Sequence, residues 1–225
     1  MFALNEGDRD KTIADVASGA SSFCAEWRQQ NQSRCIAIDP VYGLGALELE
    51  NRVRRGVATA IRNIEVAPQD YRWDSAFKSV SDHQQERTSA ALRFLADIRE
   101  SRYYIAAQIE HLPLMDDSVD LVLSSHLLFT YAGSLSIDFH VKSLTEMVRI
   151  ARSEVRIFPV VGFEYNADAT VAAVMEWSRR IEGLSISIVP VEYEFLRGAD
   201  KMMVISKTAR SENSNSDSLF TLTEG

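Results

Sequence analysis

Two carboxylates stand near the start of the chain, each at the end of a short apolar run. Asp15 ends the run that begins at Thr12, and Asp39 follows the run Cys35–Ile38. A turn of small residues centred on Gly19 comes after Asp15 and leads into a segment with helical character. In an α/β fold, small residues at a helix N-terminus let the backbone approach a ligand, and a carboxylate after the next strand accepts hydrogen bonds from ribose hydroxyls. The pattern therefore predicts a site for a nucleoside-bearing ligand.

The elements that must position these residues alternate between strand and helix along the chain. Apolar spacing predicts helices over 44–65, 137–152 and 167–181, a helix that opens with a capping box at 81–84, and further strands over 103–108, 119–124, 155–161, 184–189 and 201–206. This alternation predicts an α/β fold with a doubly wound, mostly parallel seven-stranded sheet. The connection at 196–200 is too short for a parallel crossover, so the last two strands should be antiparallel.

The domain organisation is expected to be simple. One α/β domain spans 1–207, and a polar, disordered tail is expected over 208–225. Residues 44–101 form a helical insertion between the second and third strands. We expect this insertion to act as a lid that selects the substrate. The alternative is that its helices only cover a sheet edge or form a dimer interface.

Composition narrows the classes of function. The chain has 225 residues, a net charge of −8 and an isoelectric point near 5.1, which weighs against a broad nucleic-acid surface. No segment has the length and apolar character of a signal peptide or a membrane span. Cys24 and Cys35 are expected to be reduced, buried thiols in a cytoplasmic protein, and no metal site is expected.

Taken in order, these motifs resemble those of the class I S-adenosylmethionine-dependent methyltransferases. The segment Asp15–Ser21 resembles the family's first glycine-rich motif, although only its middle glycine is present. The segment Gln108–Pro113 resembles the adenine-binding segment, with Gln108 in place of the usual Asp. The segment Leu112–His126 resembles the fourth strand and its approach, and it is the most specific of the three matches.

The resemblance implies a Rossmann-like methyltransferase fold, S-adenosylmethionine as cofactor and methyl transfer as the reaction. The cofactor-binding residues that it implies are Asp15, Ala17, Ser18, Gly19, Asp39, Pro40, Gln108, Ile109, Ser124 and Ser125. His126 and Tyr131 are candidate catalytic residues, although a packing or cofactor-shaping role is the preferred interpretation of His126. Tyr71, Trp73 and Phe129 are candidate substrate contacts, with packing in the core or a loop as the alternative for each.

A small molecule is the expected methyl acceptor, because the acidic composition and the helical insertion weigh against a macromolecule. One alternative keeps the cofactor but changes the chemistry to cyclisation or aminocarboxypropyl transfer, with release of methylthioadenosine. Another is a non-catalytic binding protein. A nicotinamide dehydrogenase ranks last, because the turn lacks a full G-x-G-x-x-G motif. We expect a monomer or a homodimer with no nucleic-acid or membrane partner.

Overall fold

A computed structural model describes residues 1–74, 76–161 and 167–208. Its centre is a seven-stranded sheet in the order β3-β2-β1-β4-β5-β7-β6. The strands are β1 (Ile13–Val16), β2 (Cys35–Ile38), β3 (Tyr104–Ile105), β4 (Val119–Ser125), β5 (Ala151–Phe158), β6 (Leu184–Pro190) and β7 (Lys201–Lys207). Neighbouring strands from β3 to β5 are parallel, whereas β7 is antiparallel to both β5 and β6. The predicted α/β sheet with an antiparallel final strand is confirmed.

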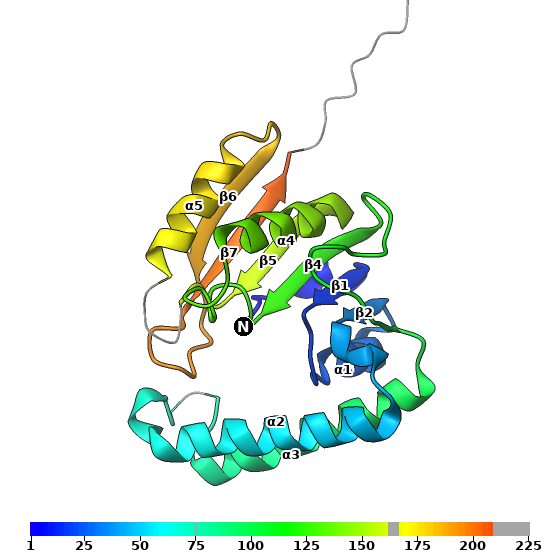
Figure 1. The fold of residues 1–225 in the computed structure, drawn as a ribbon, viewed down its shortest axis with the longest axis vertical. Coiled ribbons are helices and arrows are strands. Elements are labelled where there is room, and N and C mark those ends of the chain that lie inside the picture. Colours follow the sequence, from blue (N-terminus) through cyan, green and yellow to red (C-terminus); the bar gives the residue numbers. More distant parts are fainter. Residues whose placement is uncertain (75, 162–166, 209–225) are drawn as a thin grey trace, which may run out of the picture.

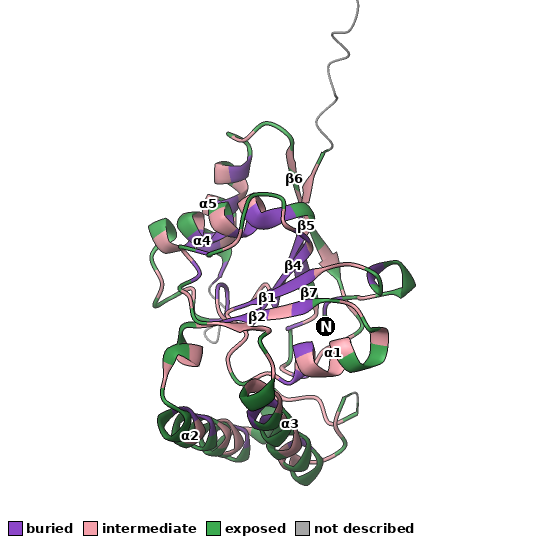
Figure 2. Cartoon of the chain, turned by 90° about the vertical axis from the view of Figure 1, so that its right-hand side faces the viewer, coloured by how far each residue is buried: buried purple, intermediate pink, exposed green. Residues whose placement is uncertain are grey.

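Helices cover both faces of the sheet (Figures 1 and 2). The helices α4 (Ile137–Ile150) and α5 (Asp168–Ser178) lie on one face, and α1 (Phe23–Asn31) lies on the other. Successive residues of β4 pack into different layers: Val122 belongs to the core with α4 and α5, and Leu123 to the core with α1. Burial on both faces explains why the central strands are almost continuously apolar.

Two long helices make up the insertion after β2. They are α2 (Ala46–Val66) and α3 (Val80–Glu100), each preceded by a 3-10 turn, η2 (Pro40–Gly43) and η3 (Pro68–Asp70). In Figure 1 the two helices run side by side below the sheet, and the arrowheads of β4 and β5 point towards them. The insertion therefore lies on the side of the carboxyl edge, where open α/β sheets bind their ligands.

The C-terminal half of α3 is packed against the α/β body. The Phe94 ring centroid lies 5.8 Å from that of Tyr42 and 5.6 Å from that of Tyr104. Arg93 of α3 pairs with Glu26 of α1 at 2.7 Å. The apolar contacts hold the helix in place, while the exposed ion pair adds little stability.

Several element boundaries differ from the sequence prediction. The cap of α3 is Ser79, whose hydroxyl accepts a hydrogen bond from the Asp82 amide at 3.1 Å, so the prediction of a cap at Ser81 is wrong. Strand β3 has only two residues, because the chain then leaves the sheet for the loop that holds Gln108. Strand β5 starts at Ala151, where polar residues at its exposed end hid it from the apolar pattern.

The two cysteines also differ from the prediction. Cys24 and Cys35 form a disulfide with a Cα–Cα distance of 5.1 Å, so the prediction of two free thiols is wrong. Helix α1 packs directly on β2, and this brings the two positions together although both lie in regular elements. The predicted disordered tail lies outside the described residues, apart from its first position.

Candidate functional site

A tight turn joins β1 to α1 at the carboxyl edge of the sheet. Ala17 and Gly19 both have a φ of +57°, in the left-handed region. A residue with a Cβ pays about 1–2 kcal/mol there, so Ala17 stores backbone strain at this point. A Cβ built on Gly19 would meet no atom within 4 Å. The turn therefore presents its backbone to open space.

Asp39 holds this turn in place from the end of β2. Its Oδ2 accepts a hydrogen bond from the Gly19 amide and its Oδ1 one from the Val41 amide, both at 2.9 Å. The Tyr42 hydroxyl donates to the Gly19 carbonyl oxygen at 2.7 Å. Each carboxylate oxygen of Asp39 keeps further lone-pair capacity, so ribose hydroxyls can still donate to it. Sequence analysis missed Tyr42, and its position three residues after Asp39 was the only available signal.

The buried side chain of Asp15 has a strongly raised pKa. Its side chain is 3% exposed, and its Oδ2 accepts a hydrogen bond from the Ser18 hydroxyl at 2.6 Å. Its Oδ1 has no hydrogen-bond partner among the described residues. Burial raises the pKa of Asp15 to about 7, and the negative charge of Asp39 adds to the increase, whereas the Ser18 hydrogen bond opposes it. A buried carboxylate that lacks a cation is the state that a bound ammonium group would stabilise.

The end of β4 lies next to this turn, because β4 pairs with β1. Ser124 is fully buried, and its hydroxyl has no hydrogen-bond partner among the described residues. Ser125 still pairs with Phe158 of β5. The next residue, His126, has a φ of +55°, and its amide donates to the Phe158 carbonyl oxygen at 2.8 Å. Its ring lies edge-on to the Phe158 ring at 5.8 Å.

The other residues implied by the resemblance lie around this edge and differ in how far they are exposed. Gln108 is exposed in the loop after β3, and Ile109 beside it is buried in the core. Pro40 is exposed at the first position of η2. Tyr131 is 45% exposed in the turns after β4. Phe129 is only 1% exposed, within the core under α4, so its ring has no surface to offer a substrate.

An aromatic cluster joins the insertion to the loop between β6 and β7. Its centre is Phe195, whose ring centroid lies 4.9 Å from Tyr71 and 5.4 Å from Trp73. The ring of His83, on α3, stacks on Phe195 at 4.9 Å with an interplanar angle of 13°. The two predicted substrate contacts, Tyr71 and Trp73, thus pack against Phe195. Sequence analysis missed Phe195, because only the folded chain brings it next to the insertion.

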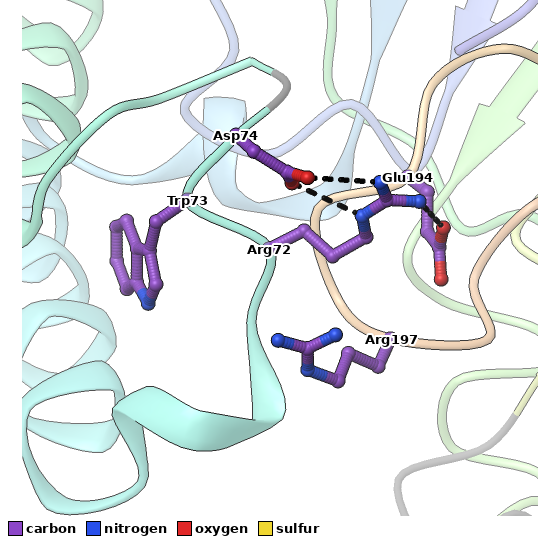
Figure 3. Close-up of a pocket in the computed structure, with 5 residues that line it drawn as sticks. All are labelled: Arg72, Trp73, Asp74, Glu194 and Arg197. Carbon is purple, nitrogen blue, oxygen red and sulfur yellow. Dashed lines mark hydrogen bonds and ion pairs between the residues drawn. The ribbon is translucent and has the colours of Figure 1, made fainter.

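Backbone and charged groups reinforce the same junction, which we call the latch (residues 70–74 and 194–197). Arg72 donates to the Phe195 carbonyl oxygen at 2.7 Å through its backbone and to Glu194 at 2.6 Å through its side chain. Figure 3 shows the Arg72 guanidinium between Asp74 and Glu194, with Arg197 on the same pocket. This open pocket of about 460 Å³ is lined by Arg72, Trp73, Asp74, Glu194 and Arg197. The carboxylates here already engage the Arg72 side chain, so the pocket serves to connect two segments.

Loss of the Arg72 side chain should loosen the latch without unfolding the protein. Because exposed ion pairs contribute about 0–1 kcal/mol, Arg72→Gln should lower the free energy of unfolding in urea by less than about 1 kcal/mol. The local opening should be larger, with backbone amide exchange at residues 70–74 faster by about tenfold. Arg179→Gln, which breaks a pair on the exposed end of α5, is the control and should leave exchange at the latch unchanged. Unchanged exchange in Arg72→Gln would contradict the role given to this pair.

His126 should remain neutral throughout the physiological range. His126 is an exposed residue at the end of β4, but desolvation by the protein around its ring lowers its pKa to about 4, and the positive charge of Arg87 adds to this decrease. A base with so low a pKa is poorly matched to proton abstraction near neutrality. Titration of the histidine ring protons by NMR, with His126→Asn to assign the signal, should show no protonation between pH 8 and pH 5.5. A midpoint near 6.5 would contradict this environment.

The rest of the described chain offers no competing centre. In residues 1–74, 76–161 and 167–208, no three His, Cys, Asp or Glu side chains come together as a group that could hold a metal ion. Within the same ranges, no helix combines the length and the apolar character needed to cross a membrane.

The residues at the carboxyl edge fit S-adenosylmethionine. Asp39 offers acceptors at the end of β2, and the open space over Gly19 allows close approach to the backbone. The unpartnered Asp15 carboxylate oxygen and Ser124 hydroxyl are buried polar atoms that a ligand could satisfy. An ammonium and a carboxylate on the same ligand, as on its methionine part, match an acid and backbone amides at this turn.

Comparisons with known proteins also indicate a methyltransferase. A family model described as a methyltransferase domain matches residues 14–158, more than half of the chain. Uncharacterized protein MJ0045 of Methanocaldococcus jannaschii is 28% identical over 210 residues, which cover 92% of this chain and 90% of that protein.

Two solved methyltransferase structures are similar to this chain over most of its length. A SAM-dependent methyltransferase from Aquifex aeolicus is 14% identical, with a TM-score of 0.43 and coverage of 92% of this chain and 84% of that chain. Magnesium protoporphyrin IX methyltransferase from Synechocystis PCC 6803, solved with bound SAM, is 8% identical, with a TM-score of 0.46 and coverage of 90% and 73%. Likeness at this level carries no argument about substrate. The match of the family model is the decisive finding: the chain belongs to the methyltransferase domain family, as a class I transferase with S-adenosylmethionine as its cofactor.

Proposed function

We propose that this protein transfers the methyl group of S-adenosylmethionine to a small molecule held between the carboxyl edge of the sheet and the insertion of residues 44–101. The observation that carries the proposal is the insertion itself. Its helices lie on the ligand side of the sheet, and the latch fixes their far end to the β6–β7 loop. A site that is covered by helices in this way suits a small acceptor better than a folded macromolecule.

The cofactor would be held by the residues that the turn and the strand ends bring together. We assign Asp39 to the ribose hydroxyls and Asp15 to the methionine ammonium group. The backbone around Ala17, Ser18 and Gly19 would face the methionine carboxylate. These roles follow from the unpartnered Asp15 oxygen, the open space over Gly19 and the remaining lone pairs of Asp39.

The remaining residues of the resemblance have supporting roles in this proposal. Gln108 and Ile109 would contact the adenine, with Pro40 beside it and with Ser124 and Ser125 nearer the methionine part. When bound, the cofactor supplies a sulfonium methyl group with an excellent leaving group, so the protein has mainly to align the acceptor. We give His126 a shaping role, because its low pKa makes it a poor base.

The substrate side would be formed by the insertion and the β6–β7 loop. Tyr71 and Trp73 form part of the wall around Phe195. Tyr131, exposed after β4, would lie at the rim. Phe129 is left out of the pocket, because it supports this segment from within the core.

The reaction can be tested through the fate of the cofactor. The protein, S-adenosylmethionine and fractionated pools of small molecules are incubated, and the nucleoside products are measured by mass spectrometry. Formation of S-adenosylhomocysteine that depends on a low-molecular-weight fraction supports the proposal. Release of methylthioadenosine would indicate attack elsewhere on the cofactor. Methylation only of protein or nucleic-acid fractions would contradict the small-molecule acceptor.

Two further expectations remain predictions within this proposal. The absence of a nucleic-acid partner is consistent with the net charge of −8. A monomer or a homodimer is the expected oligomeric state. The expectation of a cytoplasmic location depends partly on free thiols, and the Cys24–Cys35 disulfide removes that support.

A further inference from the structure

The side chain of Tyr42 joins the turn between β1 and α1 to the helical insertion. Its hydroxyl donates to the Gly19 carbonyl oxygen at 2.7 Å. Its ring packs against the core beneath α1 and also against the core of the insertion. The residue lies in η2, between Asp39 at the end of β2 and Ala46 at the start of α2. Tyr42 therefore contacts both parts of the molecule with one short side chain.

The ring of Tyr42 is packed against helix α3 of the insertion. The fully buried ring of Phe94, on α3, lies 5.8 Å from it between centroids. The Tyr104 ring stands edge-on to Tyr42 at 5.2 Å, and the Tyr104 hydroxyl donates to Asp97 of α3 at 2.7 Å. Close-packed side chains leave little room for independent movement, so a displacement of the Tyr42 ring must also displace Phe94.

The hydroxyl of Tyr42 completes the hydrogen bonding of Gly19. Asp39 accepts from the Gly19 amide at 2.9 Å, and Tyr42 donates to the carbonyl oxygen of the same residue. Burial raises the pKa of the Tyr42 hydroxyl, a hydrogen bond with Ser18 opposes this increase, and the negative charge of Asp15 adds to it. The hydroxyl therefore stays protonated and remains a donor near neutral pH. A ligand that restrains this turn also restrains the Tyr42 side chain.

We infer that Tyr42 is a positioning residue, which couples the occupancy of the cofactor site to the position of helix α3. When the cofactor fixes the turn at Gly19, the Tyr42 hydroxyl is held, and its ring holds Phe94 in place. Such coupling is reciprocal, so an ordered insertion also strengthens cofactor binding. The inference rests on the proposed place of the cofactor at this turn and does not depend on the identity of the methyl acceptor.

Amide hydrogen exchange of the full chain tests the inference, with and without saturating S-adenosylhomocysteine as the probe. In the wild type, the probe should slow exchange over residues 90–98 of α3 by about fivefold. Tyr42→Phe keeps the ring and removes the donor, so it should exchange like the wild type when free and lose the slowing when saturated. Tyr104→Phe is the matched control, because it loses a hydroxyl bonded to Asp97 of the same helix. It should exchange faster in both states and keep the fivefold difference between them.

A second variant interrupts the same contact from the other side. Phe94→Leu removes the ring that faces Tyr42 and leaves Gly19 and Asp39 intact. It should still bind S-adenosylhomocysteine and should also lose the slowing of exchange over residues 90–98. This variant decides the question if Tyr42→Phe does not fold or does not bind the probe.

Three outcomes would overturn the inference. One is a wild-type α3 whose exchange does not respond to S-adenosylhomocysteine. Another is a full fivefold slowing that survives in Tyr42→Phe or in Phe94→Leu. A third is a Tyr104→Phe variant that loses the slowing as completely as Tyr42→Phe, because the tyrosines would then have only a structural role. Failure of the proposed function would show separately, as absence of S-adenosylhomocysteine formation with any small molecule, and the two results can be told apart.

Discussion

The dissociation constant of S-adenosylmethionine should rise about thirtyfold between pH 8 and pH 5.5, and Asp15→Asn should remove most of that rise. The reason is the buried carboxyl of Asp15, whose pKa burial raises to about 7 in the free protein. The ammonium group of the cofactor favours the charged form of this acid. Below pH 7 the acid must first lose a proton, so each further pH unit weakens binding by about tenfold.

The same acid should make the free protein less stable as the pH rises. Because the pKa of Asp15 in the folded state lies above its unfolded value of 3.8, its contribution to stability is complete below about pH 4. That contribution is lost as the pH rises through 7, at a cost of up to about 4 kcal/mol. At pH 8, Asp15→Asn should therefore unfold at a higher urea concentration than the wild type, although it binds the cofactor less tightly.

Calorimetric titrations from pH 5.5 to pH 8 on both proteins isolate the contribution of Asp15, since titration of the ligand itself is common to both. Asp10→Asn, which removes an exposed acid from the segment before β1, is the matched control and should keep the wild-type slope. A wild-type affinity that does not change with pH would contradict the prediction. A slope that persists in Asp15→Asn would do the same.

The backbone of the site could be predicted from the sequence because it depends on local signals. Asp15 and Asp39 each follow an apolar run, and parallel strands bring such ends to one edge of the sheet. The small residues between Ala17 and Ser21 mark the turn. The pairing of the Gly19 amide with Asp39 could not be predicted, because it depends on how far the turn folds back over β2.

The substrate side could not be predicted to the same extent, because its contacts join segments far apart in the chain. Phe195 meets Tyr71 only because the β6–β7 loop and the insertion lie side by side. Phe129 lies in the core, which is the alternative that the sequence left open for this aromatic residue near a strand end.

A side chain at position 19 should cost the protein most of its cofactor affinity. Gly19→Val should raise the dissociation constant of S-adenosylmethionine at least a hundredfold, which corresponds to about 2.7 kcal/mol. The new Cβ would enter the open space over the turn, where no atom lies within 4 Å and where we place the cofactor. The left-handed φ of +57° adds about 1–2 kcal/mol of backbone strain, which should appear as lost stability in urea. The Gly19 amide could then move away from Asp39.

Two further glycine variants separate the two causes. A Cβ on Gly45 also meets no atom within 4 Å, but its φ is −62°, so Gly45→Val tests space without strain. Gly183 has a φ of +79° and lies in the turn before β6, where an added Cβ would come within 3.3 Å of the Thr208 Oγ1. Gly183→Val therefore tests backbone strain together with local crowding, far from the turn between β1 and α1. We expect both controls to bind S-adenosylmethionine like the wild type, and Gly183→Val alone to lose stability. If Gly183→Val weakened binding as much as Gly19→Val, the loss would reflect general destabilisation, and the open space over Gly19 would not be the cofactor site.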